Sequence, residues 1–145
     1  MKSFVKRTLY FSYGSNLNKG QMSIRCPNAM PLGTFMLKDW RLVFRGVADI
    51  EPHKGGILPV GAWSLTDKCE LALDVYEGYP RLYTKKWFNI EGKRYMTYVM
   101  NRGGISRPSK GYVETIRQGY HDFGLNPAFL TEAIQHSQML DDIAS

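Results

Sequence analysis

Cysteine and histidine are scarce in this chain of 145 residues, which has two of the first and three of the second. Cys26 and Cys69 have no CxxC spacing, and a chain of this length can bury a core without a disulfide, so we expect reduced, packed thiols. His53, His121 and His136 lie far apart without the paired spacing of metal ligands on a helix. This spacing argues against a zinc site and favours exposed or hydrogen-bonded imidazoles.

The chain also lacks an apolar run long enough for a membrane helix, and its first residues lack the apolar centre of a secretory signal. These absences predict a cytoplasmic protein without a membrane partner. With 43% hydrophobic residues, the chain has the size and composition of one compact domain over residues 1–145.

Acidic residues are in the minority, because 19 Lys and Arg against 13 Asp and Glu give a net charge of +6. A basic chain is a candidate for nucleic-acid binding. Here, however, the positive residues occur as singles and pairs such as Lys85-Lys86, interleaved with acids, whereas a nucleic-acid face usually has a denser cluster. The pattern disfavours nucleic acid as a partner and favours an acidic small molecule.

Alternating apolar residues predict strands over most of the first two thirds of the chain. The alternation changes parity within residues 35–44, which requires a bulge or turn near Lys38-Asp39. Proline and glycine predict a loop over 52–56, and Glu91-Gly92 is placed to close a hairpin. The predicted strands cover residues 8–13, 35–37, 40–44, 47–50, 57–63, 87–90 and 95–100.

A helix is predicted directly after the strand that ends at residue 63. Thr66 or Asp67 caps its start, and Asp67 with Glu70 has the reciprocal spacing of a capping box. The four-residue spacing of Leu71 and Val75 predicts that both face inward.

Glycine, asparagine and proline bound the other helices. Asn18 caps a short helix that ends before Pro27, Gly78 and Gly124 end the second and third helices, and Asn126 caps the last. The inward residues expected on the last two helices are Val113, Ile116, Tyr120, Phe123, Phe129, Leu130, Ala133 and Ile134. Strands followed by helices predict an α+β fold, with a sheet able to curl into a barrel.

The first strand ends abruptly at Tyr13-Gly14-Ser15-Asn16, just before the first helix. Backbone N–H groups collect at such a junction, and glycine lets the backbone approach a ligand closely. The turn is therefore a candidate anion or oxyanion site, although the four residues alone also fit an ordinary connection between a strand and a helix.

Five further motifs occur in order with this turn. They are Arg25-Cys26-Pro27, Gly46-Val47-Ala48-Asp49-Ile50, Asp74-Val75-Tyr76-Glu77-Gly78-Tyr79-Pro80, Pro108-Ser109-Lys110-Gly111-Tyr112 and Gly124-Leu125-Asn126-Pro127. Together with the turn, this set resembles the γ-glutamylcyclotransferase family over nearly the whole chain. The resemblance implies a small mixed β-barrel flanked by helices, no metal or organic cofactor, and conversion of a γ-glutamyl compound to 5-oxoproline and a free amine.

The resemblance also implies roles for individual residues, namely a substrate-cradling loop, an acid/base and a substrate contact. These are Tyr13, Gly14, Ser15, Asn16 and Leu17 for the loop, Glu77 for the acid/base and Tyr112 for the contact.

In such a reaction the nucleophile belongs to the substrate, because its α-amine can fold back onto the γ-carbonyl. The protein must hold this curled conformer, stabilise the oxyanion and move a proton, and we expect loop amides and Glu77 to do the last two. Ser15 is disfavoured as a covalent nucleophile, since no histidine lies near it in the sequence. We expect residues 52–59 and 101–110 to shape the pocket for the leaving group, whose identity stays open.

The other hypothesis is a non-catalytic module that binds an acidic small molecule or nucleic acid in the same pocket. The sequence carries no signal for an oligomeric state.

Overall fold

The computed structural model describes residues 6–101 and 103–144, which form a mixed sheet with helices and confirm the α+β class. The elements are β1 (Arg7–Ser12), η1 (Ser15–Leu17), α1 (Lys19–Arg25), β2 (Met30–Arg45), β3 (Val47–Thr66), α2 (Asp67–Glu77), β4 (Tyr83–Ile90), β5 (Lys93–Met100), α3 (Lys110–Phe123) and α4 (Ala128–Ala144). None of the described helices is long and apolar enough to cross a membrane.

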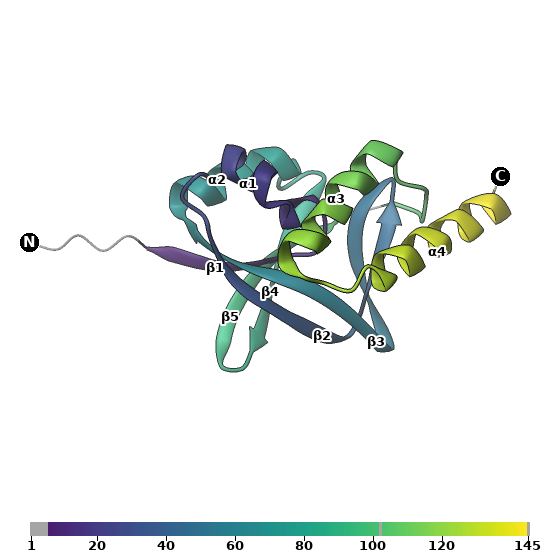
Figure 1. Ribbon diagram of the computed structural model, residues 1–145, viewed down its shortest axis with the longest axis horizontal. Coiled ribbons are helices and arrows are strands. Elements are labelled where there is room, and N and C mark those ends of the chain that lie inside the picture. Colours follow the sequence, from purple (N-terminus) through teal and green to yellow (C-terminus); the bar gives the residue numbers. More distant parts are fainter. Residues whose placement is uncertain (1–5, 102, 145) are drawn as a thin grey trace, which may run out of the picture.

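The strands form one five-stranded sheet in the order β2-β3-β1-β5-β4 (Figure 1). β1 is antiparallel to β3 and parallel to β5. The long segment between β1 and β5 therefore returns the chain to the starting end of β1 before β5 begins. The expected barrel is not closed, because β2 and β4 remain as edges of the sheet. In Figure 1 α1 and α2 lie side by side, α4 lies along the β2–β3 hairpin, and the β4–β5 hairpin projects away from the helices.

β2 and β3 form a long hairpin, and the predicted irregularity at Lys38-Asp39 is confirmed. The register shifts between Lys38 and Trp40, and Asp39 has a φ of 66°. The loop predicted over 52–56 is wrong, because these residues belong to β3. Pro52 pairs with Trp40 where, within residues 6–101 and 103–144, β3 pairs with β2 alone, so its missing amide hydrogen is tolerated.

The β4–β5 hairpin is confirmed. Its strands pair from Tyr83–Met100 to Ile90–Lys93, and the two loop residues, Glu91 and Gly92, have φ of 50° and 77°. Positive φ at both central positions is the signature of a type I′ turn, whose twist matches that of the strands.

Local capping was predicted well. The Asn18 side chain accepts a hydrogen bond from the Gln21 amide, and Gly78 and Gly124 end α2 and α3 in the left-handed conformation. Asn126 accepts a hydrogen bond from the amide of Ala128, the first residue of α4, at 3.0 Å.

The start of α2 resolves the choice between its two candidate caps. Thr66 accepts a hydrogen bond from the Cys69 amide at 3.2 Å, so Thr66 is the cap and Asp67 is already helical. The Asp67–Glu70 capping box is wrong, because Glu70 instead pairs with Lys85 Nζ at 2.6 Å.

The predicted inward face of α2 is also wrong. Leu71 and Val75 are 67% and 83% exposed, whereas Cys69 and Leu73 are buried. Both pairs have four-residue spacing, so helical periodicity alone fits either face, and packing against the sheet selects the second.

Two groups of buried side chains hold the helices to the sheet. α3 and α4 cover the larger group, and α1 and α2 cover the smaller one, which includes Cys26 and Cys69. Both cysteines are free, as expected, and Cys26 Sγ lies 3.3 Å from the Cys69 carbonyl oxygen. Burial raises the pKa of Cys26 to about 12, which keeps it a thiol.

Candidate active site

The turn after β1 adopts a short 3₁₀ conformation. The Leu17 amide donates to the Gly14 carbonyl and the Asn18 amide to the Ser15 carbonyl, each at 3.0 Å. The amides of Ser15 and Asn16 take no part in these bonds, as expected at the start of a helix. A Cβ on Gly14 would lie 3.0 Å from Ala48 Cβ, so a side chain there would press the turn away from β3, whereas glycine allows this close approach.

Glu77, the last residue of α2, meets this turn through Asn16. Asn16 Nδ2 donates to Glu77 Oε1 at 3.2 Å and to the Tyr10 hydroxyl at 3.0 Å. On the other side of the amide, Arg25 Nη1 donates to Asn16 Oδ1 at 3.2 Å. The arginine thus fixes which way the Asn16 amide points, and so directs its N–H groups at the carboxylate.

Burial sets the protonation of Glu77. It raises the pKa of this carboxyl group to about 7, against the lowering effects of the Arg25 charge and the Asn16 hydrogen bond. A carboxyl group with this pKa exists in both forms near neutral pH, which suits a group that both accepts and returns a proton.

Tyrosines form most of the wall around Glu77. The cavity has a volume of about 20 Å³ and is lined by Tyr10, Tyr13, Gly14, Ser15, Asn16, Ala48, Glu77, Tyr83, Tyr98 and Tyr112. Burial raises the pKa of each of these five tyrosines well above the ordinary value, so their hydroxyls stay protonated. None of the lining residues is a histidine.

The structure therefore brings Tyr13, Gly14, Ser15 and Asn16 together with Glu77 and Tyr112 around one cavity. It does not bring Leu17 into the cavity. The Leu17 side chain is fully buried, and its backbone packs so tightly on α3 that a Cβ at Gly119 would lie 2.7 Å from Leu17 C. Leu17 therefore anchors the turn to α3.

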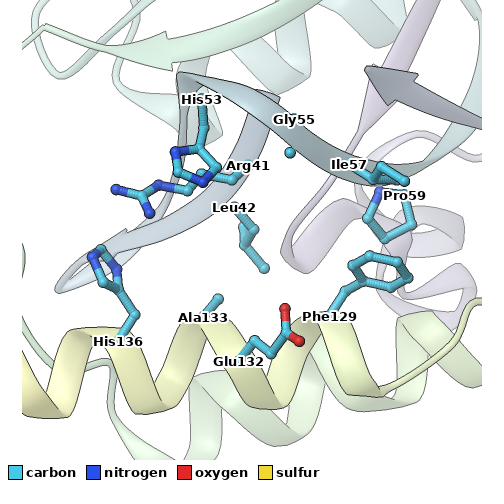
Figure 2. Close-up of a pocket in the computed structure, with 11 residues that line it drawn as sticks. Arg41, Leu42, His53, Gly55, Ile57, Pro59, Phe129, Glu132, Ala133 and His136 are labelled. Carbon is cyan, nitrogen blue, oxygen red and sulfur yellow. The ribbon is translucent and has the colours of Figure 1, made fainter. Parts of the chain in front are cut away.

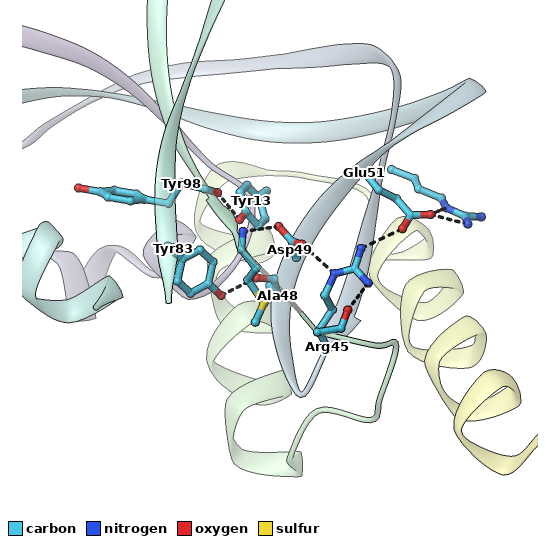
Figure 3. A network of polar contacts seen from close by, with 10 residues as sticks. Tyr13, Arg45, Ala48, Asp49, Glu51, Tyr83 and Tyr98 are labelled. Carbon is cyan, nitrogen blue, oxygen red and sulfur yellow. Dashed lines mark hydrogen bonds and ion pairs between the residues drawn. The ribbon is translucent and has the colours of Figure 1, made fainter. Parts of the chain in front are cut away.

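Backbone contacts from two strands hold the tyrosines in place (Figure 3). Tyr13 donates to the Tyr98 carbonyl, and Tyr83 donates to the Ala48 carbonyl at 2.7 Å. The Ala48 amide in turn donates to the Tyr112 hydroxyl at 3.0 Å. Sequence reasoning did not find Tyr10, Tyr83 or Tyr98 as wall residues.

A charged network continues from Ala48 along β3 (Figure 3). The buried carboxylate of Asp49 accepts from Arg45 Nε at 2.8 Å and from the Met100 amide at 3.0 Å. Arg45 also pairs with Glu51 at 3.1 Å, and Glu51 pairs with Arg41 at 2.7 Å. Each of the four carboxylate oxygens of Asp49 and Glu51 accepts a hydrogen bond. The network therefore holds the part of β3 that carries Ala48 in place.

Tyr76 does not line the cavity but contacts Ser15, which does. Its hydroxyl lies 2.9 Å from Ser15 Oγ, and the Arg25 guanidinium stacks 3.8 Å from the centre of its ring. The tyrosine is nevertheless 43% exposed. Its ring therefore lies at the surface, held by one hydrogen bond and one cation–π contact.

Neither of the segments expected to shape the pocket lines this cavity. Residues 52–59 lie in β3 and contribute to a separate cavity against α4, and the described residues of 101–110 line neither.

Among the described residues no group of three or more His, Cys, Asp or Glu side chains is arranged to hold a metal ion.

Solved structures share this fold. A human protein described as uncharacterized, loc79017, superimposes with a TM-score of 0.77 at 25% identity, covering 88% of this chain and 86% of that chain. A structure named gamma-glutamyl cyclotransferase superimposes with a TM-score of 0.78 at 24% identity over the same shares. YkqA from Bacillus subtilis matches with a TM-score of 0.70 at 21% identity, covering 92% of this chain and 55% of that chain.

A comparison with curated proteins found no match. The family model described as "Gamma-glutamyl cyclotransferase, AIG2-like" matches residues 10–122, which include every lining residue of the cavity. Because this match spans more than half of the chain, the protein belongs to the AIG2-like γ-glutamyl cyclotransferase family.

Proposed function

We propose that this protein is a γ-glutamylcyclotransferase that releases 5-oxoproline and a free amine from a small γ-glutamyl compound. The observation that carries the proposal is Glu77, a buried carboxyl group with a pKa of about 7 that Asn16 holds beside the amide-rich turn. Family membership and the fold support the same reaction class.

In the proposed reaction the substrate's α-amine nitrogen attacks its own γ-carbonyl carbon, and the carbonyl oxygen becomes an oxyanion. The Ser15 and Asn16 amides are the donors proposed for this oxygen, because the 3₁₀ turn leaves them unused. When the intermediate collapses, the bond from the carbonyl carbon to the departing nitrogen breaks and the five-membered ring of 5-oxoproline is complete.

Glu77 moves the proton that this exchange requires. A free α-amine has a pKa of about 8 and must lose a proton to attack, while the departing nitrogen must gain one. The Glu77 carboxylate accepts the first proton and delivers it to the second nitrogen, so the enzyme returns to its starting state. Tyr112 is proposed to contact the polar end of the substrate.

Substrate entry requires a side chain to move. A cavity of about 20 Å³ has room for about one water molecule, far less than a γ-glutamyl group. Tyr76 is proposed as the side chain that moves, because its hydroxyl contacts Ser15, a lining residue, and the side chain is 43% exposed.

The test is turnover. The protein is incubated with γ-glutamyl dipeptides, γ-glutamylamines and glutathione, and 5-oxoproline is measured. Glu77→Gln preserves the shape of the side chain but cannot carry the proton, so we expect it to lose activity. Glu114→Gln makes the same change at an exposed position on α3 and serves as the control.

Absence of 5-oxoproline across the whole panel, or equal turnover by Glu77→Gln, would contradict the proposal. A salt-sensitive mobility shift of DNA or RNA that survives Glu77→Gln would instead favour the binding-module hypothesis.

A further inference from the structure

A second cavity lies between α4 and the β2–β3 hairpin (Figure 2). Its volume is about 350 Å³, within the usual range for small-molecule sites. It shares no lining residue with the Glu77 cavity. The chemistry proposed above therefore leaves this cavity without a role.

The two ends of this cavity differ in polarity. Arg41, His53 and His136 gather at one end, and Ile57, Pro59 and Phe129 form the other, as Figure 2 shows. This meeting is not predictable from the sequence, because His53 lies on β3 and His136 on α4, 83 positions apart.

The polar end has unused donors and acceptors. Arg41 engages Glu51 through Nε and Nη2, at 3.0 and 2.7 Å, which orients the guanidinium and leaves Nη1 outside the pair. His136 Nδ1 is buried and has no hydrogen-bond partner among the described residues. His136 is thus neither the exposed nor the hydrogen-bonded imidazole that the sequence led us to expect. A buried unpaired ring nitrogen is costly unless a ligand or water satisfies it.

Glu132 adds a negative group between the two ends. Its side chain projects from α4 into the cavity, between Leu42 and Phe129 in Figure 2. A simple anion would meet this carboxylate as well as Arg41. A ligand that carries both a carboxylate and an ammonium group satisfies both charges.

We propose that this cavity binds a free α-amino acid with an apolar side chain. The ligand carboxylate lies against Arg41 and the imidazoles, its ammonium group pairs with Glu132, and its side chain packs on Phe129 and its apolar neighbours. The proposal stands independently of turnover at Glu77, because the two cavities share no lining residue.

The test uses L-phenylalanine as the probe, titrated into uniformly ¹⁵N-labelled protein. We expect saturable shifts of the Gly55 and Gly56 amides, which line the cavity, with a dissociation constant on the order of 1 mM for a ligand of this size. Two matched probes each lack one charge: 3-phenylpropanoate has no ammonium group, and 2-phenylethylamine has no carboxylate. Both should bind about tenfold more weakly.

Glu132→Gln should weaken L-phenylalanine binding about tenfold, while Glu114→Gln on α3 should not change it. Glu77→Gln should retain full binding, which separates this test from that of catalysis. Three results would each overturn the proposal: no shift at Gly55 and Gly56 up to 20 mM, roughly 20 times the expected constant, equal affinity for 3-phenylpropanoate, or unchanged affinity in Glu132→Gln.

Discussion

The Glu77 cavity and the cavity beside α4 are built in opposite ways. The Glu77 cavity is small, and hydrogen bonds fix most of its polar side chains to the backbone or to one another. The cavity beside α4 is larger, and the described part of the chain offers no partner for its buried His136 Nδ1. Volume alone would direct attention to the second, but proton transfer needs a group that is both desolvated and firmly positioned, which only the first provides.

The largest expected difference between the cavities is in catalysis. Glu77→Gln should lower turnover about 100- to 10,000-fold, the usual contribution of a positioned acid/base. In the unmodified protein, kcat/KM should rise with pH through a step near pH 7, where the Glu77 carboxyl loses its proton. Initial rates of 5-oxoproline release between pH 5.5 and 9 measure both. A profile without that step would remove Glu77 from the proton transfer.

The ionic network that runs between the cavities should matter for stability. Arg45→Met leaves the buried Asp49 carboxylate without its ion pair, which should lower the free energy of unfolding by about 3 to 5 kcal/mol. Arg117→Met breaks the exposed pair with Glu114 and should change it by less than about 1 kcal/mol. Urea unfolding at pH 7.5 compares the two variants. Equal losses would show that Asp49 is effectively solvated.

The sequence predicted the first cavity better than the second, for a physical reason. The Gly14 turn and the caps at Asn18 and Gly124 are set by residues within a few positions, so local rules suffice. The contact between Asn16 and Glu77 joins distant segments, and only the resemblance to a family linked them.

Contacts that depend on strand register escaped prediction. Alternation indicates which residues share a face, but not which part of the sheet receives Tyr83 and Tyr98. For the same reason the proximity of His53 to His136 was not predicted. His53 lies in the bulge of β3, where alternation does not tell which face of the sheet a side chain occupies. Glycine and proline at 52–56 predicted a loop, whereas Pro52 pairs with Trp40 and residues 53–56 form a bulge within β3.

Burial of the Glu77 carboxylate should also lower the free energy of unfolding at alkaline pH. The folded-state pKa of Glu77 is about 7, above the ordinary value of 4.5, so the folded protein binds more protons than the unfolded chain between these values. Stability from this group is present below about pH 4.5 and is lost as the pH rises through 7. Glu77→Gln removes the charge and should stabilise the protein at pH 8 by about 1 to 3 kcal/mol.

Urea unfolding at pH 5 and pH 8 tests this expectation, with Glu114→Gln as the matched control. The gain from Glu77→Gln should shrink toward zero at pH 5. A gain of the same size at both pH values would mean that the substitution acts through packing.

In the cavity beside α4, His136 should make the free energy of unfolding depend on pH in the direction opposite to Glu77. This is the smallest of the expected effects. Burial and the charge of Arg41 hold the pKa of His136 below its ordinary value of 6.5, with His53 adding to the decrease and Glu51 opposing it. The unfolded chain therefore takes up a proton more readily as the pH falls below about 6.5, and stability from the neutral imidazole is lost in that range.

His136→Gln removes this titration, so its free energy of unfolding should fall less than that of the unmodified protein between pH 7.5 and 5.5. We expect a difference below about 1 kcal/mol, because the ring is only partly buried and solvent screens its charge. L-phenylalanine at 10 mM, roughly ten times its expected dissociation constant, should stabilise the unmodified protein more than His136→Gln. If the two proteins lose the same stability on acidification, His136 is not held neutral, and the contrast with Glu77 fails at this residue.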